Sequence, residues 1–493
     1  MALSTLAQID ADALRALFDG EALRATLPIL CVAAGALALL FFDLFDALRP
    51  LRAVAFLGAL AASAAAHLRL VAEPASAVFG GSYLADGTSG LWGLLFCIGA
   101  ALAWAYAHGY YGEQERPLRS EHDVLLLSAT AGMSLMVGAE DLILFFVGLE
   151  LLSLPLYVLA AFRRARTDSV EAGIKYFLLG SFAAGLFLYG CALVYAHTGS
   201  IALAELAEAD FSGGLDRDGL GLAGLGLIAA SLFFKVSVFP FHLWAPDVYQ
   251  GSPTPVTAVM ATGTKAAAFG FLLKLALLLP SEAAWTIALC GVITSAAGNL
   301  GALVQEDLKR MLAYSGVAHA GTVLLVVAAA VSGGASPRDA IAATLFYMGA
   351  YLFTAMGAFG LLSLLEGDGE HYSRLDNLRG LARSRPGIAA AMTLFLLSLG
   401  GIPATAGFLG KWLIFAGLVR ADMIVWAVLG ALMSVIALGY YLRVIIAMYM
   451  QPAPEGLAPP ATHRPWSAGL ATGVCAIGVL ALGCAPGILL AYL

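Results

Sequence analysis

The chain has 493 residues, of which 61% are hydrophobic and only 12% are charged, whereas soluble globular domains typically have about 25% charged residues. Its net charge of −7 argues against nucleic acid as a partner. The composition therefore argues against a soluble protein and indicates one that lies in a lipid bilayer.

Apolar segments long enough to cross a hydrocarbon core of about 30 Å recur along the whole chain. The sequences between them are short, and the acidic N-terminal residues do not resemble a signal peptide. We predict an all-α polytopic membrane protein with no soluble domain. Its fourteen predicted transmembrane segments are 27–43, 51–68, 90–111, 121–138, 140–161, 170–197, 219–249, 255–280, 282–304, 311–331, 338–365, 387–419, 423–450 and 467–492.

The basic residues of the connecting loops predict the orientation of the chain. They are more frequent on the inner side when the N-terminus is placed outside. With an even number of crossings, both termini are then expected outside. The abundance of Ala, Gly and Arg indicates a GC-rich bacterial gene. We therefore predict a multi-pass protein of the bacterial inner (plasma) membrane with periplasmic termini.

Five ionisable residues lie at membrane depth, where charge is costly and by default indicates function. Glu150 lies midway along the fifth segment, in "LILFFVGLELLSLPLYVL", and Lys235 lies within the seventh. Lys265 lies near the middle of the eighth, His319 in the tenth, and Lys411 in the outer half of the twelfth. The structural alternative is pairing within the helix bundle, and a buried neutral histidine is equally compatible with a packed core.

Other residues favour structural roles. Lys274 lies near a helix end, where lysine extends its amine to the membrane interface. Lys175 follows Glu171 by four residues, so it either forms a helix-surface ion pair or joins the functional set. The tyrosines and tryptophans are expected in packing or in interfacial belts. The six cysteines and eight histidines are dispersed, so we predict no metal site and no bound cofactor in this chain.

Two of the charged segments contain helix breakers. Pro240 follows Lys235, and both Pro403 and Gly407 precede Lys411. Interrupted membrane helices in corresponding places indicate an ion site between inverted repeats. The breaks are five segments apart, which predicts two inverted five-helix repeats, segments 4–8 and 9–13. The expected regions are N-terminal flanking helices at 1–120, repeats at 121–280 and 282–450, and a C-terminal helix at 451–493.

Four stretches carry a resemblance to a known family: "PFHLWAPDVYQGSPTPVTAVMATGTKAA", "FFVGLELLSLPLYVL", "EDLKRMLAYSGVAHAG" and "GIPATAGFLGKW". They are similar to the antiporter-like membrane subunits of respiratory complex I. Within this family the chain most resembles the N subunit, equivalent to subunit 2 of mitochondrial NADH dehydrogenase. "DVYQGSPTPVTA" is N-like, position 411 is lysine where the M subunit has glutamate, and the long lateral helix of the L subunit is absent from the sequence.

The resemblance implies a proton-translocating membrane-arm subunit of NADH:quinone oxidoreductase, and hence part of an enzyme. NADH, FMN, iron–sulfur clusters and quinone would bind to partner subunits, and M- and K-type subunits would be the neighbours. The residues matching the family's proton relay are Lys235 as the central lysine, Glu150 as its charge partner, Lys265 and His319 on a horizontal polar axis, Lys411 on the exit side, and Lys175 on the sixth helix.

Other functions remain open on the sequence. Subunits of an Mrp-type Na⁺/H⁺ antiporter or of a membrane-bound hydrogenase share the same helices and charges. A stand-alone solute symporter would also use interrupted helices, but it would need a substrate pocket. A structural spacer would not need buried charges. The spread of ionisable groups over several helices favours a proton relay that runs from Lys235 through Lys265 and His319 to Lys411.

Overall fold

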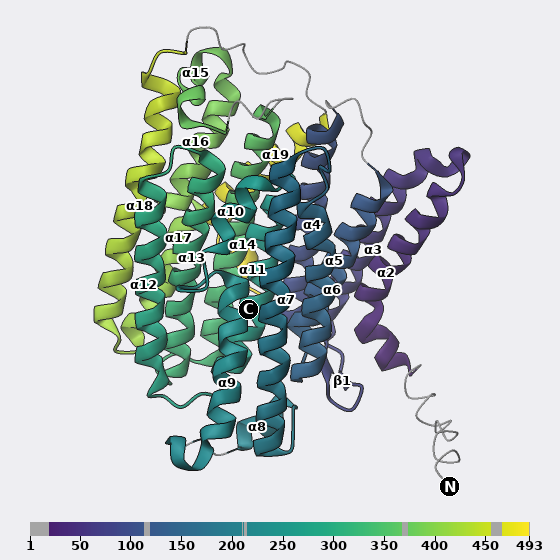
Figure 1. Ribbon diagram of the computed structural model, residues 1–493, viewed down its shortest axis with the longest axis vertical. Helices are drawn as coiled ribbons and strands as arrows, with labels where there is room; N and C mark the ends of the chain where they lie inside the picture. Colours follow the sequence, from purple (N-terminus) through teal and green to yellow (C-terminus); the bar gives the residue numbers. More distant parts are fainter. Residues whose placement is uncertain are drawn as a thin grey trace.

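The computed structural model describes residues 19–112, 119–209, 211, 214–366, 373–454 and 466–492. These residues are almost entirely helical, and the long helices run side by side along the long axis of the molecule (Figure 1). The predicted all-α membrane fold is therefore confirmed.

Twelve helical segments in the described part of the chain are long and apolar enough to cross a membrane. They are α2 (Gly20–Asp43), η1 with α3 (Asp46–Leu51 and Arg52–Ala72), α4 (Gly87–Gly112), α6 (Leu142–Ala160), α7 (Thr167–Thr198), α9 (Gly214–Val236), α11 (Thr254–Ala276), α12 (Ala283–Leu303), α13 (Leu308–Val331), α14 (Pro337–Leu365), α18 (Ile424–Met450) and α19 (Trp466–Cys484).

The other two predicted segments are also helical. One is α5 (Ser120–Gly138), whose first turn carries two acidic residues. The other is divided into α16 (Pro386–Gly400) and α17 (Ala406–Arg420), each too short to cross the membrane alone. All fourteen predicted segments thus contain helices, while the number of crossings stays a prediction.

Short elements cap the two ends of the bundle. The hairpin of β1 (Ala77–Val78) and β2 (Tyr83–Leu84) lies at the same end as α8 (Leu203–Glu208) (Figure 1). At the opposite end lie α15 (Leu381–Ser384) and the preceding η2 (Leu375–Leu378). A final turn, α20 (Gly487–Leu490), follows α19.

Both predicted helix interruptions are present. The chain leaves α9 at Val236 and resumes a helix only at α10 (Trp244–Gly251), with Pro240 in the non-helical stretch between them. Likewise, α16 ends at Gly400, and Pro403 lies in the gap before α17. Proline has no backbone N–H to donate and its ring clashes with the preceding turn, so it favours an interruption at these two places, although Pro28 and Pro155 lie inside α2 and α6.

Gly407 has a different position from the one expected. It is the second residue of α17 rather than part of the gap. A side chain there would overlap the carbonyl oxygen of Ser398 on α16, and the Gly407 N–H donates a hydrogen bond of 3.2 Å to Ser398 Oγ. The glycine therefore allows α17 to pack closely on α16. The interruption itself lies before Gly407, at residues 401–405.

One local motif recurs in the two predicted five-helix repeats. The sequence Glu-Asp-Leu occurs at 140–142, where α6 begins, and at 306–308, where α13 begins. In each, the aspartate accepts a hydrogen bond from the backbone N–H three residues later, as helix N-caps do. Each aspartate also forms a β-bridge with the loop after the next long helix, at Ala202 or Arg374. The recurrence supports the repeat, whose boundaries and inverted relation stay predictions.

Candidate functional site

Lys235 lies in the last turn of α9, beside the first helix interruption, and only 4% of the residue is exposed. Its Nζ donates hydrogen bonds to Ser153 Oγ, at 2.7 Å, and to Tyr176 OH, at 3.3 Å. The amine also lies over the rings of Tyr157 and Tyr176, at 5.9 and 5.4 Å from their centroids. Hydroxyl groups and aromatic faces thus surround this buried lysine.

Glu150, predicted as the charge partner of Lys235, lies on α6 one turn before Ser153 and is half-buried. The two groups are near enough to interact electrostatically. Among the described residues, however, Lys235 contacts hydroxyl groups and makes no direct ion pair with this carboxylate. Glu150 therefore acts on Lys235 through space and not through a direct contact.

Lys265 lies in the middle of α11, the helix at the centre of the bundle, and is also buried. Its Nζ donates a hydrogen bond of 2.7 Å to the carbonyl oxygen of Gly316 on α13. A Cβ atom at Gly316 would lie only 3.1 Å from this amine. The absence of a side chain at Gly316 therefore lets the lysine reach the backbone of the neighbouring helix.

His319 lies on α13 three residues after Gly316 and bridges two further helices. Its Nδ1 is 2.6 Å from Tyr347 OH on α14, and its Nε2 is 3.3 Å from Tyr441 OH on α18. The Tyr441 hydroxyl is also hydrogen-bonded to Ser315 Oγ. Both ring nitrogens thus face hydroxyl groups, which can serve either tautomer of the imidazole.

Lys411 lies on α17 beside the second helix interruption. Its Nζ donates hydrogen bonds of 3.0 and 3.1 Å to the carbonyl oxygens of Leu399 and Gly400, at the end of α16. The last carbonyls of a helix have no partner within the helix and carry the negative end of its dipole. The interruption therefore provides a polar site for this buried amine.

Two small cavities lie between His319 and the second interruption. One is lined in part by His319, Lys411 and Asn299, and the other in part by His319, Tyr351 and Ser398. Each has a volume of about 10 Å³, which is close to the space that one water molecule needs. Single waters would fit between the histidine and the lysine.

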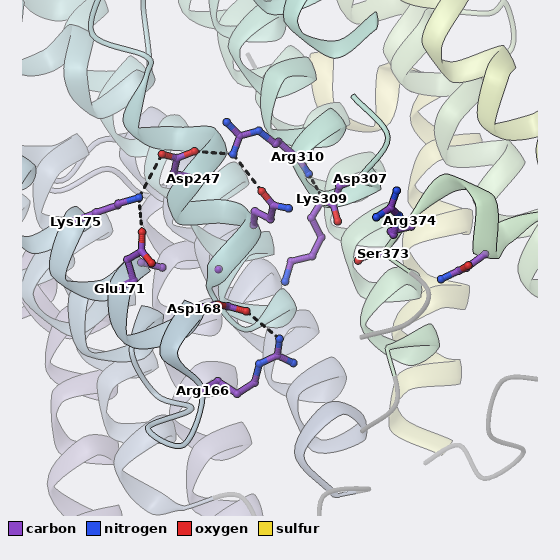
Figure 2. A pocket seen from close by; sticks show the side chains of 14 residues that line it. Arg166, Asp168, Glu171, Lys175, Asp247, Asp307, Lys309, Arg310, Ser373 and Arg374 are labelled. Atoms are coloured by element: carbon purple, nitrogen blue, oxygen red, sulfur yellow. Dashed lines mark hydrogen bonds and ion pairs between the residues drawn. The ribbon is translucent and has the colours of Figure 1, made fainter. Parts of the chain in front are cut away.

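Lys175 belongs to a different group of residues. Its side chain is 42% exposed and pairs with Glu171 at 2.6 Å, the helix-surface pair foreseen from the sequence, and with Asp247 at 3.5 Å. Asp247 in turn pairs with Arg310 at 2.6 Å, so the interactions continue across a polar pocket of about 580 Å³ (Figure 2). The structure thus separates Lys175 from the buried lysines.

Several polar contacts in the interior were not expected from the sequence. Tyr176, Tyr347 and Tyr441 contact the predicted relay residues, although tyrosines were expected only in packing or belts. Lys309 lies between the predicted segments 282–304 and 311–331, where a loop cation is expected, whereas in the structure it forms a fully buried ion pair with Glu366. The sequence does contain a signal for this pair. The two opposite charges lie at adjoining ends of consecutive predicted segments, 311–331 and 338–365.

No cluster of three or more His, Cys, Asp or Glu side chains suited to a metal ion occurs in the ranges that the structure describes. The six cysteines are all free thiols. The expectation that cofactors bind to other subunits stays a prediction.

Comparison with known proteins identifies the family that the chain matches. Residues 139–437 match the family described as "NADH:quinone oxidoreductase/Mrp antiporter, TM". A relative from Myxococcus xanthus (strain DK1622), NADH-quinone oxidoreductase subunit N, is 38% identical, and the match covers 95% of this chain and 96% of the relative.

Solved structures have the same fold. A chain of respiratory complex I from Thermus thermophilus with bound aureothin superposes with a TM-score of 0.79 at 38% identity, covering 94% of this chain and 98% of that one. A chain of the Mrp complex from Dietzia sp. DQ12-45-1b superposes with a TM-score of 0.81, covering 95% and 96%, but at 22% identity, so that similarity concerns the fold alone.

Proposed function

The chain belongs to the NADH:quinone oxidoreductase/Mrp antiporter family of membrane subunits, and we propose that it is the N-type subunit in the membrane arm of a bacterial NADH-quinone oxidoreductase, where it translocates protons. The name and near-complete coverage of the Myxococcus xanthus relative support this proposal. So does the similarity to a chain of the Thermus thermophilus complex.

The observation that carries the proton-transfer function is the set of three buried lysines without a carboxylate in contact. Among the described residues, Lys235, Lys265 and Lys411 donate only to hydroxyl or backbone carbonyl oxygens. A buried ammonium ion without an ion pair is costly. Each amine can therefore alternate between its protonated and neutral forms, as a proton carrier must.

The proposed route runs from Lys235 to Lys265, His319 and Lys411. The hydroxyl groups beside Lys235 and His319, together with the small cavities before Lys411, supply hydrogen-bonding steps along it. A pocket of about 260 Å³ is lined in part by Ile414 and Gly417, in the turns of α17 that follow Lys411 toward the predicted outer face. This pocket supports proton release on the outer side.

Glu150 would control proton release from Lys235. Its carboxylate stabilises the ammonium form electrostatically, so neutralising or moving Glu150 would promote loss of the proton. Moving one charge against a potential of about 150 mV costs about 3.5 kcal/mol. A change in the interaction between two partly buried charges is of that order.

The replacement of Lys235 by alanine tests the proposal. Membrane vesicles that contain the assembled complex would be assayed for NADH-driven quinone reduction and proton uptake. We expect strongly reduced uptake with unchanged amounts of complex. Lys274→Ala is a control, because Lys274 is ion-paired with Glu140 near a helix end. Full proton uptake by the Lys235 variant would reject the central role of this lysine.

An Mrp-type antiporter or a membrane-bound hydrogenase is the alternative assembly. The fold is shared with the Mrp complex chain, so assignment depends on the partner proteins. We propose that M- and K-type subunits are the neighbours, that partner subunits hold NADH, FMN, iron–sulfur clusters and quinone, and that both termini are periplasmic. Affinity purification from native membranes, followed by measurement of NADH oxidation, distinguishes the two assemblies.

A further inference from the structure

Lys309 and Glu366 form a fully buried ion pair near the predicted inner face, apart from the relay described above. Lys309 Nζ lies 3.7 Å from a carboxylate oxygen of Glu366, and their side chains are 1% and 0% exposed. The Lys309 amine also donates a hydrogen bond of 2.9 Å to the carbonyl oxygen of Ser252, while Thr254 Oγ1 donates to Glu366. The pair therefore joins the beginnings of α11 and α13 to the end of α14.

This pair adjoins the large polar pocket at the predicted inner face. Lys309 is among the residues that line the pocket of about 580 Å³, together with charged side chains such as Asp307 and Arg310 (Figure 2). The volume accommodates many waters. Lys309 thus has hydrated space on one side and the buried Glu366 carboxylate on the other.

A second observation indicates water at the same place. The hydroxyl group of Ser252 is fully buried and has no hydrogen-bond partner among the residues that the structure describes. The backbone carbonyl of this same residue accepts the hydrogen bond from Lys309. Buried polar atoms without a protein partner usually bind an ordered water. We therefore expect a water next to the ion pair.

The helix that carries Lys309 also leads to the relay. Lys309, Gly316 and His319 follow one another at intervals of seven and three residues on α13, which places them on one face of the helix. Gly316 accepts the hydrogen bond from Lys265. With a rise of 1.5 Å per residue, Gly316 is about 10 Å and His319 about 15 Å beyond Lys309 along the helix axis.

The other predicted repeat lacks this pair. After its Glu-Asp-Leu motif, the position that corresponds to Lys309 is Ile143, which is exposed. The helix-starting motif and its β-bridge form in both repeats. The local fold of a repeat therefore does not need a buried ion pair at this position.

We infer that Lys309 and Glu366 are a further proton-transfer pair, which takes up protons from the inner-face pocket and passes them to the Lys265–His319 part of the relay. This inference rests on the proposed function. A proton from pocket water would bind to the Glu366 carboxylate and form the carboxylic acid, which weakens its attraction for the Lys309 ammonium. The same proton then passes through water to the neutral Lys265 amine, and the carboxylate is restored.

The double variant Lys309→Met/Glu366→Gln separates proton transfer from packing. It keeps the side-chain volumes and removes both charges, so neither is left buried and unpaired. If the pair transfers protons, the complex assembles, and NADH-driven proton uptake per complex falls several-fold. If the pair only holds the helices together, the double variant pumps like the wild type, which would overturn the inference. Glu306→Gln, which removes the exposed ion pair with Arg374, is the matched control.

A spectroscopic comparison of the wild type with a single conservative variant covers the case in which the double variant does not assemble. Infrared difference spectra of the complex, recorded on addition of NADH, should contain a carboxylic acid band that shifts in Glu366→Asp. Spectra without any band assignable to Glu366 would contradict the inference. Lys235→Ala serves as the companion variant. Pumping lost there but kept in the double variant rejects only the pair, whereas pumping kept in both rejects the proposed function.

Discussion

Lys411 Nζ donates a hydrogen bond to the carbonyl oxygen of Gly400, the last residue of α16, although the two residues belong to different halves of an interrupted helix. The contact exists because the helix ends at Gly400 and leaves its carbonyl without a helical partner. Interruption and charge are therefore parts of the same site at Lys411, whereas the amine of Lys235 lies beside an interruption but donates to Ser153 and Tyr176.

We predict that Lys411→Met abolishes proton release at this end of the route while the complex still assembles. Methionine fills a similar volume, and Leu399, whose carbonyl oxygen loses its hydrogen bond, lines one of the two small cavities, where a water would fit. Proton uptake into vesicles and the amount of complex in native gels are the measurements. Lys411→Arg, whose guanidinium keeps its proton at all working pH values, should also lose uptake, because the route needs a group that can release the proton it binds.

Glu150→Gln should lower proton uptake more than it lowers assembly. The substitution preserves the size of the side chain and removes the negative charge that favours the ammonium form of Lys235. Because the two side chains make no direct ion pair among the described residues, the loss of packing should be small. A variant that fails to assemble, yet pumps normally per remaining complex, would favour a structural role for Glu150.

Gly316→Ala should disturb the contact between α11 and α13. The added methyl group would lie 3.1 Å from Lys265 Nζ and 3.0 Å from Tyr351 OH, so the lysine would have to move. Overpacking of this kind typically costs about 1–3 kcal/mol, and proton uptake should fall with it. Gly185→Ala is the control, because a Cβ atom there has nothing within 4 Å. Thermal unfolding of the complex and vesicle assays would compare the two, and equal behaviour would argue against a role for the Lys265–Gly316 contact.

Tyr347→Phe should weaken the relay at His319 with little effect on stability. It removes the hydroxyl group 2.6 Å from Nδ1 and keeps the ring, so the loss is of one hydrogen bond, about 1 kcal/mol. We expect reduced proton uptake in vesicles with normal assembly. Tyr189→Phe on the exposed surface of α7 is the control. Identical uptake in both variants would indicate that the Tyr347 hydroxyl serves packing alone.

The fold could be predicted to a large extent because its signals are local. Long apolar segments give helices, and Pro240 and Pro403 mark the interruptions, since proline disfavours the helix that precedes it. Gly407 shows the limit of this reasoning. Its neighbour Ser398 is on the other half of the interrupted helix, so its packing role depends on a tertiary contact.

The candidate site could be predicted only in part for the same reason. Charged residues within apolar segments, such as Lys235 and Lys265, are visible in the sequence because they break the apolar pattern. A tyrosine is common in such segments, and nothing local distinguishes Tyr441, which contacts His319, from a residue of an interfacial belt. Lys309 looks like a loop cation until the fold brings Glu366 beside it.

The account depends on the amine of Lys235 changing its protonation state during turnover. Infrared difference spectra of the assembled complex with ¹⁵N-labelled lysine, recorded during NADH oxidation, test this most directly. The account predicts a lysine band that appears in the wild type and is missing in Lys235→Met. An amine at position 235 that stays in one protonation state throughout turnover would contradict it.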